Sequence, residues 1–466
     1  MRAAPRGTNT VRPRSVKIKR LQAEHAATLV PTFGVFWLLV FCFVAFSQKL
    51  PLGPVAGAAA IVAAALRGKE FAVPPFYRWY LGYIAIGAMG WFTTRYPSVV
   101  SEELFEGVKI ALLGIAAWNV IYTPRSARTF VVWYLALFAL YPVRGALYNY
   151  VHGFTEFGRI AWNFYFRNPN DLAMTCFLPL GLCGYVIFVE KGRWLRWSAW
   201  IGVVVITGVQ MLTQSRGAML SLGAGILYFA MHTKRRVRAL LVIGALCAVA
   251  VAATPSHVWD RLAGLSNLSS EDLSKVDPEH SAAGRVTLMR LAWHTALSHA
   301  VLGVGLGAYP YENARITRGD PSVGHDERGQ RDAHSTYIGS AAETGMVGGL
   351  CVLLTEVASI AFCRASRKRI LEHDDARRWV TALLALEASM VAFALGAIVN
   401  SAERSMFFVL QFVIPCALAS IIAPAKPRME NGPAARESRR RATRSGGGTP
   451  QRLEHGAIRE NGALHH

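Results

Sequence analysis

The sequence predicts an all-α polytopic membrane protein with about 12 transmembrane helices. Of its 466 residues, 53% are hydrophobic and only 17% are charged, which is too apolar for a single water-soluble domain. Long apolar stretches recur along the chain, separated by short breaks that contain charged residues, proline or glycine. Lysine and arginine gather in every second break, as they do in the cytoplasmic loops of membrane proteins.

Twelve apolar stretches are candidates to cross a bilayer core of about 30 Å. The first follows a basic leader and is too long, and too far from the N-terminus, for a cleaved signal peptide. The second, fourth and eighth are short. The stretches are 27–47, 51–66, 76–94, 108–122, 128–146, 171–189, 195–212, 217–232, 237–254, 336–363, 379–400 and 405–423.

The basic loops set the expected orientation, because lysine and arginine favour the cytoplasmic side. With twelve spans, every basic loop and both termini are cytoplasmic, so we attribute the formal net charge of +21 to topology and expect no nucleic-acid partner. The expected parts are a basic cytoplasmic leader (1–26), helices 1–9 (27–254), a large outward loop with helices of its own (255–335), helices 10–12 (336–423) and a disordered basic cytoplasmic tail (424–466).

Function is expected in the two long outward loops, about 144–170 and 255–335, because short loops merely connect spans. Residues 285–302 mix apolar and polar side chains in a pattern that predicts a helix lying on the membrane or on the bundle. The glycines of 303–307 resemble a dinucleotide loop only superficially, since no strand precedes them, and they predict a flexible turn.

His334 is the first candidate for chemistry. It stands at the outward start of the tenth span, where the positive end of the helix dipole disfavours imidazolium and keeps the ring neutral. A neutral imidazole can accept a proton, whereas the alternative is a histidine that only caps the helix. Small residues from Gly339 to Gly349 predict close packing of another helix further along the same span.

Several arginines are expected at the same outward level. Positive charges are uncommon on that side, so arginines at helix ends favour an anionic ligand such as a phosphate or pyrophosphate. The alternative for each is snorkelling or pairing with a carboxylate such as Glu403. In 167–171, Asn170 or Asp171 is the expected helix cap, although the amides also suit sugar hydroxyls. The arginines are Arg144, Arg159, Arg167 and Arg216.

We expect neither a metal nor another cofactor. The outward carboxylates of 102–106 and 320–332 form no Asp-x-Asp pair, and the residues of 325–327 lack the spacing of a helical zinc site. The 7 cysteines lie in apolar runs without a CxxC motif.

These features resemble the O-antigen ligase/polymerase family of bacterial inner-membrane glycosyltransferases over roughly 130–410. The resemblance favours the ligase and implies a GT-C-type fold with a periplasmic helical cap. The segments that carry it are Arg-Asn-Pro-Asn-Asp-Leu-Ala (167–173), Gln-Ser-Arg-Gly (214–217), Gly-Arg (284–285), Gly-Val-Gly-Leu-Gly (303–307) and His334-Ser335 followed by Gly345 and Gly348.

The resemblance also implies a reaction in lipopolysaccharide biosynthesis. O-antigen polysaccharide would pass from undecaprenyl pyrophosphate to a sugar hydroxyl of lipid A-core at the periplasmic face of the inner membrane, by an inverting, metal-independent mechanism. His334 would be the general base, and Arg216 and Arg285 would bind the pyrophosphate. Membrane lipids would surround the spans. Further donor or acceptor contacts would come from Arg144, Arg159, Arg167, Asn170 and Arg290.

Three alternatives stay open at this point. The same signature occurs in O-antigen polymerases and in protein O-oligosaccharyltransferases, which differ mainly in the acceptor. A transporter or flippase of lipid-linked sugars is the non-enzymatic alternative. Its best support is the three glutamates inside predicted spans, Glu343, Glu356 and Glu387, although transporters usually also show inverted repeats.

Overall fold

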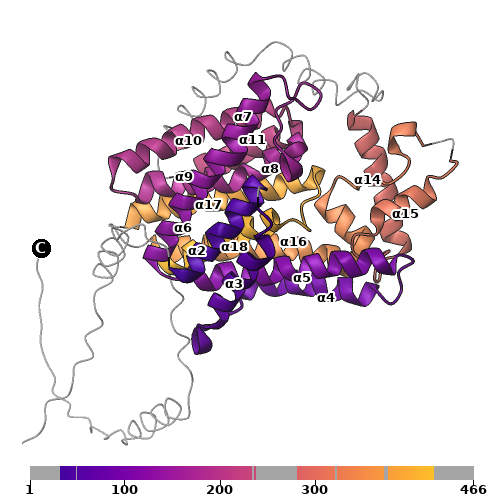
Figure 1. The fold of residues 1–466 in the computed structure, drawn as a ribbon, viewed down its shortest axis with the longest axis horizontal. Helices are drawn as coiled ribbons and strands as arrows, with labels where there is room; N and C mark the ends of the chain where they lie inside the picture. The colour runs from indigo at the N-terminus through magenta and orange to yellow at the C-terminus, as the bar shows by residue number, and fades with distance from the viewer. Residues whose placement is uncertain are drawn as a thin grey trace, which may run out of the picture. The chain divides into compact units, whose positions relative to one another are not determined.

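The computed structural model describes residues 32–48, 50–233, 236–237, 281–320, 323–371 and 376–423 (Figure 1). These residues form helices joined by turns and loops, with one isolated antiparallel bridge between Glu156 and Arg159. The predicted leader (1–26), nearly all of the ninth stretch (237–254) and the predicted tail (424–466) lie outside the described residues.

Each of the other eleven apolar stretches contains a helix. Three helices run well beyond the predicted bounds: most of 108–122 lies within a helix that starts at Pro97, 128–146 lies within a helical segment that reaches Val151, and the helix over 336–363 continues to Ile370. The helices are α2 (Phe33–Ser47), α3 (Gly53–Ala65), α4 (Arg78–Gly90), α5 (Pro97–Val120), α6 (Pro124–Phe138), α7 (Arg144–Val151), α8 (Pro169–Thr175), α9 (Phe177–Val189), α10 (Arg193–Leu212), α11 (Arg216–His232), α16 (Thr336–Ile370), α17 (Arg377–Gly396) and α18 (Met406–Ile422).

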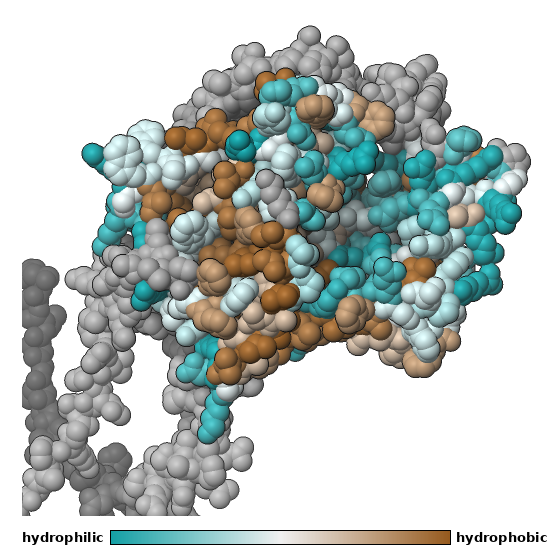
Figure 2. Space-filling model, in the orientation of Figure 1, coloured by the Kyte–Doolittle hydropathy of each residue, from teal (hydrophilic) through white to brown (hydrophobic). Residues whose placement is uncertain are grey.

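Five helical segments among the described residues are long and apolar enough to span a membrane, as expected for a polytopic membrane protein. Three further apolar helices, α2, α3 and α18, are shorter than 18 residues, so the total of twelve spans remains a prediction. Figure 2 shows apolar side chains gathered over the region of α2 and α18, and hydrophilic side chains over α14 and α15. The five segments are Pro124–Val151, Pro169–Val189, Arg193–Leu212, Thr336–Ile370 and Arg377–Val399.

The centre of the bundle is α17, which packs against α9, α11 and α16. Small residues let these helices approach closely: a Cβ atom on Gly184 would lie 2.6 Å from the Cβ of Ala385, and one on Gly225 would lie 2.7 Å from the Cβ of Ala392. The buried Arg367 also joins α16 to α17, because its Nε lies 2.7 Å from Glu387 Oε2.

Two hydrogen bonds join segments that the predicted alternation of loops places on the same side. At the end expected to be cytoplasmic, Arg67 donates to the carbonyl oxygen of Asn119 at 2.9 Å. At the other end, Thr94 Oγ1 donates to the carbonyl oxygen of Val304 at 2.6 Å. The membrane side of each end stays a prediction.

Two helices of the large loop predicted over 255–335 are described, α14 (Ser281–Ser298) and α15 (Tyr309–Ile316). The hydroxyl of Tyr309 donates to the carbonyl oxygen of Leu288 at 3.2 Å, which joins α15 to α14. Tyr96, at the start of α5, donates to Glu312 Oε2 at 3.0 Å. These contacts fix the described part of this loop against the start of α5.

The helix α16 is broken, which the sequence did not predict. Thr344 has non-helical dihedral angles and Gly345 has a φ of 73°. The preceding loop supplies partners at the break: the amides of Val304 and Gly305 donate to the carbonyl oxygens of Ala342 and Glu343, both at 2.9 Å, and the amide of Met346 donates to Ala300. The loop therefore replaces the hydrogen bonds that the broken helix loses.

Candidate functional site

His334 lies immediately before α16, with a φ of 51°. Ser335 caps the helix and its Oγ accepts from the amide of Ile338 at 3.5 Å, so the histidine does not act as the cap. Burial lowers the pKa of the half-buried imidazole, and the positive charge of Arg285 lowers it further, against the opposing charge of Asp332. The neutral ring predicted from the helix dipole thus has burial as its main cause.

Arg285 and Asp332 also act electrostatically on Asp171 at the start of α8. Asn400, just after α17, donates to Asp171 Oδ1 at 3.2 Å. The carbonyl oxygen of Asn400 accepts from the Thr336 amide at 2.9 Å, two residues after His334. The structure thus brings α14, α8, the start of α16 and the end of α17 together around His334.

A pocket of about 500 Å³ opens beside Asp171. Two arginines and one asparagine from the loop before α8 line it, together with aromatic side chains and one glutamate. Its lining residues are Glu156, Phe157, Arg159, Phe164, Tyr165, Arg167, Asn168, Pro169 and Asp171. Asp171 is joined through Asn400 to Thr336, two residues after His334, so the pocket adjoins the surroundings of His334.

Two predicted ligand residues, Arg159 and Asn170, contact each other. Arg159 is 8% exposed, and its Nη2 donates to Asn170 Oδ1 at 2.8 Å. Its Nε donates to the carbonyl oxygen of Thr213 at 2.6 Å. Arg159 thereby ties α8 to the turn that precedes Arg216, which makes it a structural link as well as a wall of the pocket.

Arg216 is the first residue of α11 and follows a tight turn in which Gln214 has a φ of 51°. The amide of Ile160 donates to the carbonyl oxygen of Leu212 at 3.1 Å. Together with the Arg159 contact to Thr213, this places the turn against the loop that lines the pocket. Arg216 therefore stands at the same end of the bundle as His334.

The remaining predicted arginines are exposed. Arg167 lies at the pocket, with its Nε 3.8 Å from Glu156 Oε2. Arg144 begins α7, and Arg290 lies on α14 five residues after Arg285, so it points to a different face of that helix. Neither Arg144 nor Arg290 has a described contact that joins it to His334.

The helix cap in the 167–171 segment differs from the prediction. Asn168 caps α8, and its Oδ1 accepts from the amide of Asn170 at 2.9 Å. Asn170 and Asp171 lie two and three residues too late to cap, because Pro169 already occupies the first helical position. Their side chains are left to contact Arg159 and Asn400.

Sequence reasoning missed a charged cluster around Arg404. The Nη1 atom of this arginine lies 3.1 Å from Glu103, and its Nε lies 3.6 Å from Glu343 and 3.9 Å from Glu403. Burial raises the pKa of Glu403 to about 8. The adjacent acid and base in the short 400–405 loop were the available signal, but their partners come from α5 and α16.

The described residues contain no group of three or more histidine, cysteine, aspartate or glutamate side chains that could hold a metal ion.

Residues 201–353 match the protein family described as O-antigen ligase. This confirms, over those residues, the resemblance that the sequence motifs predict. The matched segment includes Arg216, Arg285 and His334, and it ends before Glu403 and Arg404. No curated protein matches the chain.

Proposed function

Because residues 201–353 match the O-antigen ligase family, we propose that this membrane protein is an O-antigen ligase. It transfers polysaccharide from undecaprenyl pyrophosphate to a sugar hydroxyl of lipid A-core, at the periplasmic face of the bacterial inner membrane. The proposal includes about 12 spans in a GT-C-type arrangement with the 255–335 loop as the cap. The observation that carries it is the half-buried His334 at the start of α16, near Asp171 and Asn400, where the charge of Arg285 on α14 also acts on it.

His334 is the proposed general base. Its lowered pKa keeps the imidazole neutral at pH 7, so a ring nitrogen can take the proton of the acceptor hydroxyl. The hydroxyl oxygen then bonds to the anomeric carbon as the bond from that carbon to the pyrophosphate oxygen breaks. Attack from the face opposite the leaving group inverts the anomeric configuration.

Arg285 and Arg216 are proposed to bind the pyrophosphate. Guanidinium groups hold phosphate oxygens by paired hydrogen bonds and stabilise the negative charge that develops on the leaving group. A bound pyrophosphate also offsets the positive charge of Arg285 at His334. The imidazole becomes a stronger base when the donor arrives, because the charge that lowers its pKa is then compensated.

The pocket beside Asp171 is the proposed place for sugars or phosphates of the substrates. Exposed Arg167 lines it and supplies a cation, while Arg159 and Asn170 hold its wall in place through their mutual contact. Arg144 and Arg290 are proposed only as outer contacts for substrate phosphates. The mechanism uses no metal, since arginine supplies the positive charge.

The buried glutamates support an enzyme over a transporter. Each of the three has a partner within the described residues: Glu343 pairs with Arg404, Glu387 with Arg367, and Glu356 accepts from the hydroxyl of Tyr337. A proton relay would need exchangeable partners along a path. These three contacts lie in separate places: two join α16 or α17 to another segment, and the Tyr337–Glu356 contact lies within α16.

The test is transfer by purified protein in detergent. The assay contains undecaprenyl-pyrophosphate-linked glycan, lipid A-core and EDTA, and follows the gel shift of the acceptor. We expect wild-type transfer to survive EDTA and His334→Ala to lose at least about 100-fold in rate. His294→Ala, an exposed histidine on α14, is the matched control and should keep its rate. Normal transfer by folded His334→Ala would refute the general base.

If the wild type transfers nothing to lipid A-core, the ligase assignment is wrong. Peptide acceptors and donor-to-donor polymerisation then separate the protein O-oligosaccharyltransferase and polymerase alternatives. Transport of the lipid-linked glycan across vesicles without any transfer would favour the flippase alternative.

A further inference from the structure

The helix α10 is far less covered by protein than the other candidate spans. Only 22% of its apolar window is buried, against 44–83% in the other four. Its exposed side chains are large: Trp197 is 65% exposed, Trp200 is 44% and Val204 is 65%. A spanning helix with so much exposed apolar surface has room for a lipid along its length.

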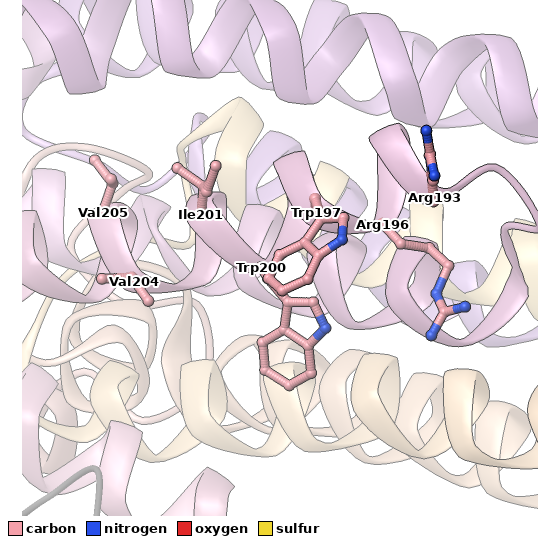
Figure 3. A pocket seen from close by; sticks show the side chains of 7 residues that line it. All are labelled: Arg193, Arg196, Trp197, Trp200, Ile201, Val204 and Val205. Atoms are coloured by element: carbon pink, nitrogen blue, oxygen red, sulfur yellow. The ribbon is translucent and has the colours of Figure 1, made fainter.

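The exposed face of α10 changes its chemistry in order along the helix (Figure 3). Two arginines come first, two tryptophans follow, and aliphatic side chains complete the face. Together they line a pocket of about 590 Å³. We call this surface the α10 face, made of Arg193, Arg196, Trp197, Trp200, Ile201, Val204 and Val205.

The two arginines are available for an anion. Both are exposed, and neither forms an ion pair with a carboxylate of the described residues; the one described partner is the ring of Trp194, whose centroid lies 5.2 Å from Arg193 Cζ. Lys191, two residues before Arg193, is also exposed and basic. Positive charge therefore collects at one end of the α10 face, and no carboxylate of the described residues pairs with these two arginines.

The order of groups on the α10 face matches that of a phospholipid. Guanidinium groups bind phosphate, tryptophan prefers the headgroup boundary, and aliphatic side chains contact acyl chains. We propose that the α10 face is a binding site for one anionic phospholipid of the bilayer. Its phosphate lies at Arg193 and Arg196, its glycerol region lies at Trp197 and Trp200, and an acyl chain lies along Ile201 and Val204.

A second copy of the chain fits this surface less well. In a symmetric dimer the same face meets itself, so the arginines of two copies would be brought together without a carboxylate between them. An anionic lipid compensates the charge instead. The site is also distinct from the proposed active site: α10 has 20 residues and a length of about 30 Å, and its other end leads into the turn before Arg216.

The test is lipid binding by the full-length protein in detergent, measured by native mass spectrometry with added phosphatidylglycerol or phosphatidylcholine. We expect the wild type to retain phosphatidylglycerol more tightly than phosphatidylcholine. Arg193→Gln/Arg196→Gln should weaken phosphatidylglycerol binding roughly 10- to 30-fold and leave phosphatidylcholine binding unchanged.

Arg377→Gln/Arg378→Gln is the matched control. These arginines are also exposed at the start of a span and carry the same charge, but the tryptophan beside them, Trp379, is buried. The control should bind phosphatidylglycerol as the wild type does. An equal loss in both double variants, equal binding of the two lipids by the wild type, or a change of oligomeric mass in place of lipid loss would overturn the proposal.

A second variant tests the apolar part of the site. Trp197→Ala/Trp200→Ala should weaken retention of both lipids, because the two tryptophans contact the glycerol region that all glycerophospholipids share. Unchanged retention would refute the assigned orientation. An unaltered melting temperature of the delipidated variants establishes that folding is intact. Failure of this lipid-binding test leaves the proposed glycan transfer untouched, because the transfer assay measures a different site.

Discussion

The guanidinium of Arg285 on α14 acts on the imidazole of His334 and lowers its pKa, in addition to the effect of burial. A histidine base works only in its neutral form, so the acidic limb of kcat/KM should lie below the ordinary histidine pKa of about 6.5. Arg285→Gln removes the positive charge. The pKa of His334 then rises, and the acidic limb should move to higher pH.

The measurement is kcat/KM for transfer from pH 5 to 8. The slower rate expected for Arg285→Gln does not alter the position of the limb. Arg290→Gln changes an exposed arginine on the same helix and should leave the limb in place. A limb that moves to lower pH in Arg285→Gln, or equally in both variants, would contradict the electrostatic coupling.

Removal of Arg404 should destabilise the fold. Glu343 is 1% exposed and Glu403 is 2% exposed, and Arg404 is the cation of their cluster. Arg404→Gln leaves buried carboxyl groups without that charge, at an expected loss of about 3–5 kcal/mol in the free energy of unfolding.

Denaturant unfolding in detergent measures this loss. Lys109→Gln breaks the exposed pair with Glu106 and should cost under about 1 kcal/mol. The double variant Arg404→Gln/Glu343→Gln should recover part of the stability. No recovery would indicate that the arginine acts through packing alone.

Alanine at position 345 should disturb the break in α16. Gly345 has a φ of 73°, and an added Cβ would lie 2.4 Å from the carbonyl oxygen of Val301. Both the dihedral angle and the clash oppose a side chain, so Gly345→Ala should lower the free energy of unfolding by more than about 2 kcal/mol.

Gly208→Ala is the control, since an added Cβ there has no heavy atom within 4 Å and the residue lies inside α10. It should be neutral or stabilising by up to about 1 kcal/mol. Equal melting temperatures of the two variants would show that the break does not require glycine at position 345.

Arg159 and Arg167 should separate structure from substrate binding. Arg159→Ala loses hydrogen bonds to Thr213 and Asn170 inside the protein, so it should lower the free energy of unfolding by about 3 kcal/mol. Arg167 is exposed at the pocket, and Arg167→Ala should raise KM with an unchanged melting temperature. A stable Arg159→Ala protein would remove the structural role of Arg159.

The apolar pattern predicted most helices because burial in a bilayer requires long apolar segments with internal backbone hydrogen bonds. It placed the start of α5 eleven residues too late, since the exposed glutamates of the first turns carry no membrane signal. It also treated 336–363 as one continuous helix. The break at Thr344 depends on partners in the 300–305 loop, and a local pattern does not contain them.

In the candidate site, too, the sequence predicted what depends on local patterns and missed what depends on distant partners. Local rules identified His334 and Arg216 as candidates, because histidine at a helix start and arginine at an outward end are unusual in the sequence itself, whereas Arg285 came from the family resemblance. They did not identify the contact of Arg159 with Asn170 or the three carboxylates around Arg404. These contacts join segments that are apart in the chain. They also depend on side-chain directions, which the helix bounds alone do not give.

The loop inserted at the break of α16 also bears on how the protein is made. Carbonyl groups without donors are costly in hydrocarbon, and the donors for Ala342 and Glu343 come from residues synthesised earlier, Val304 and Gly305. The loop has therefore already been synthesised when α16 leaves the ribosome. This order makes the tenth predicted span dependent on the loop for its insertion, so a chain shortened within 300–305 should expose α16 to membrane quality control even though its own sequence is complete.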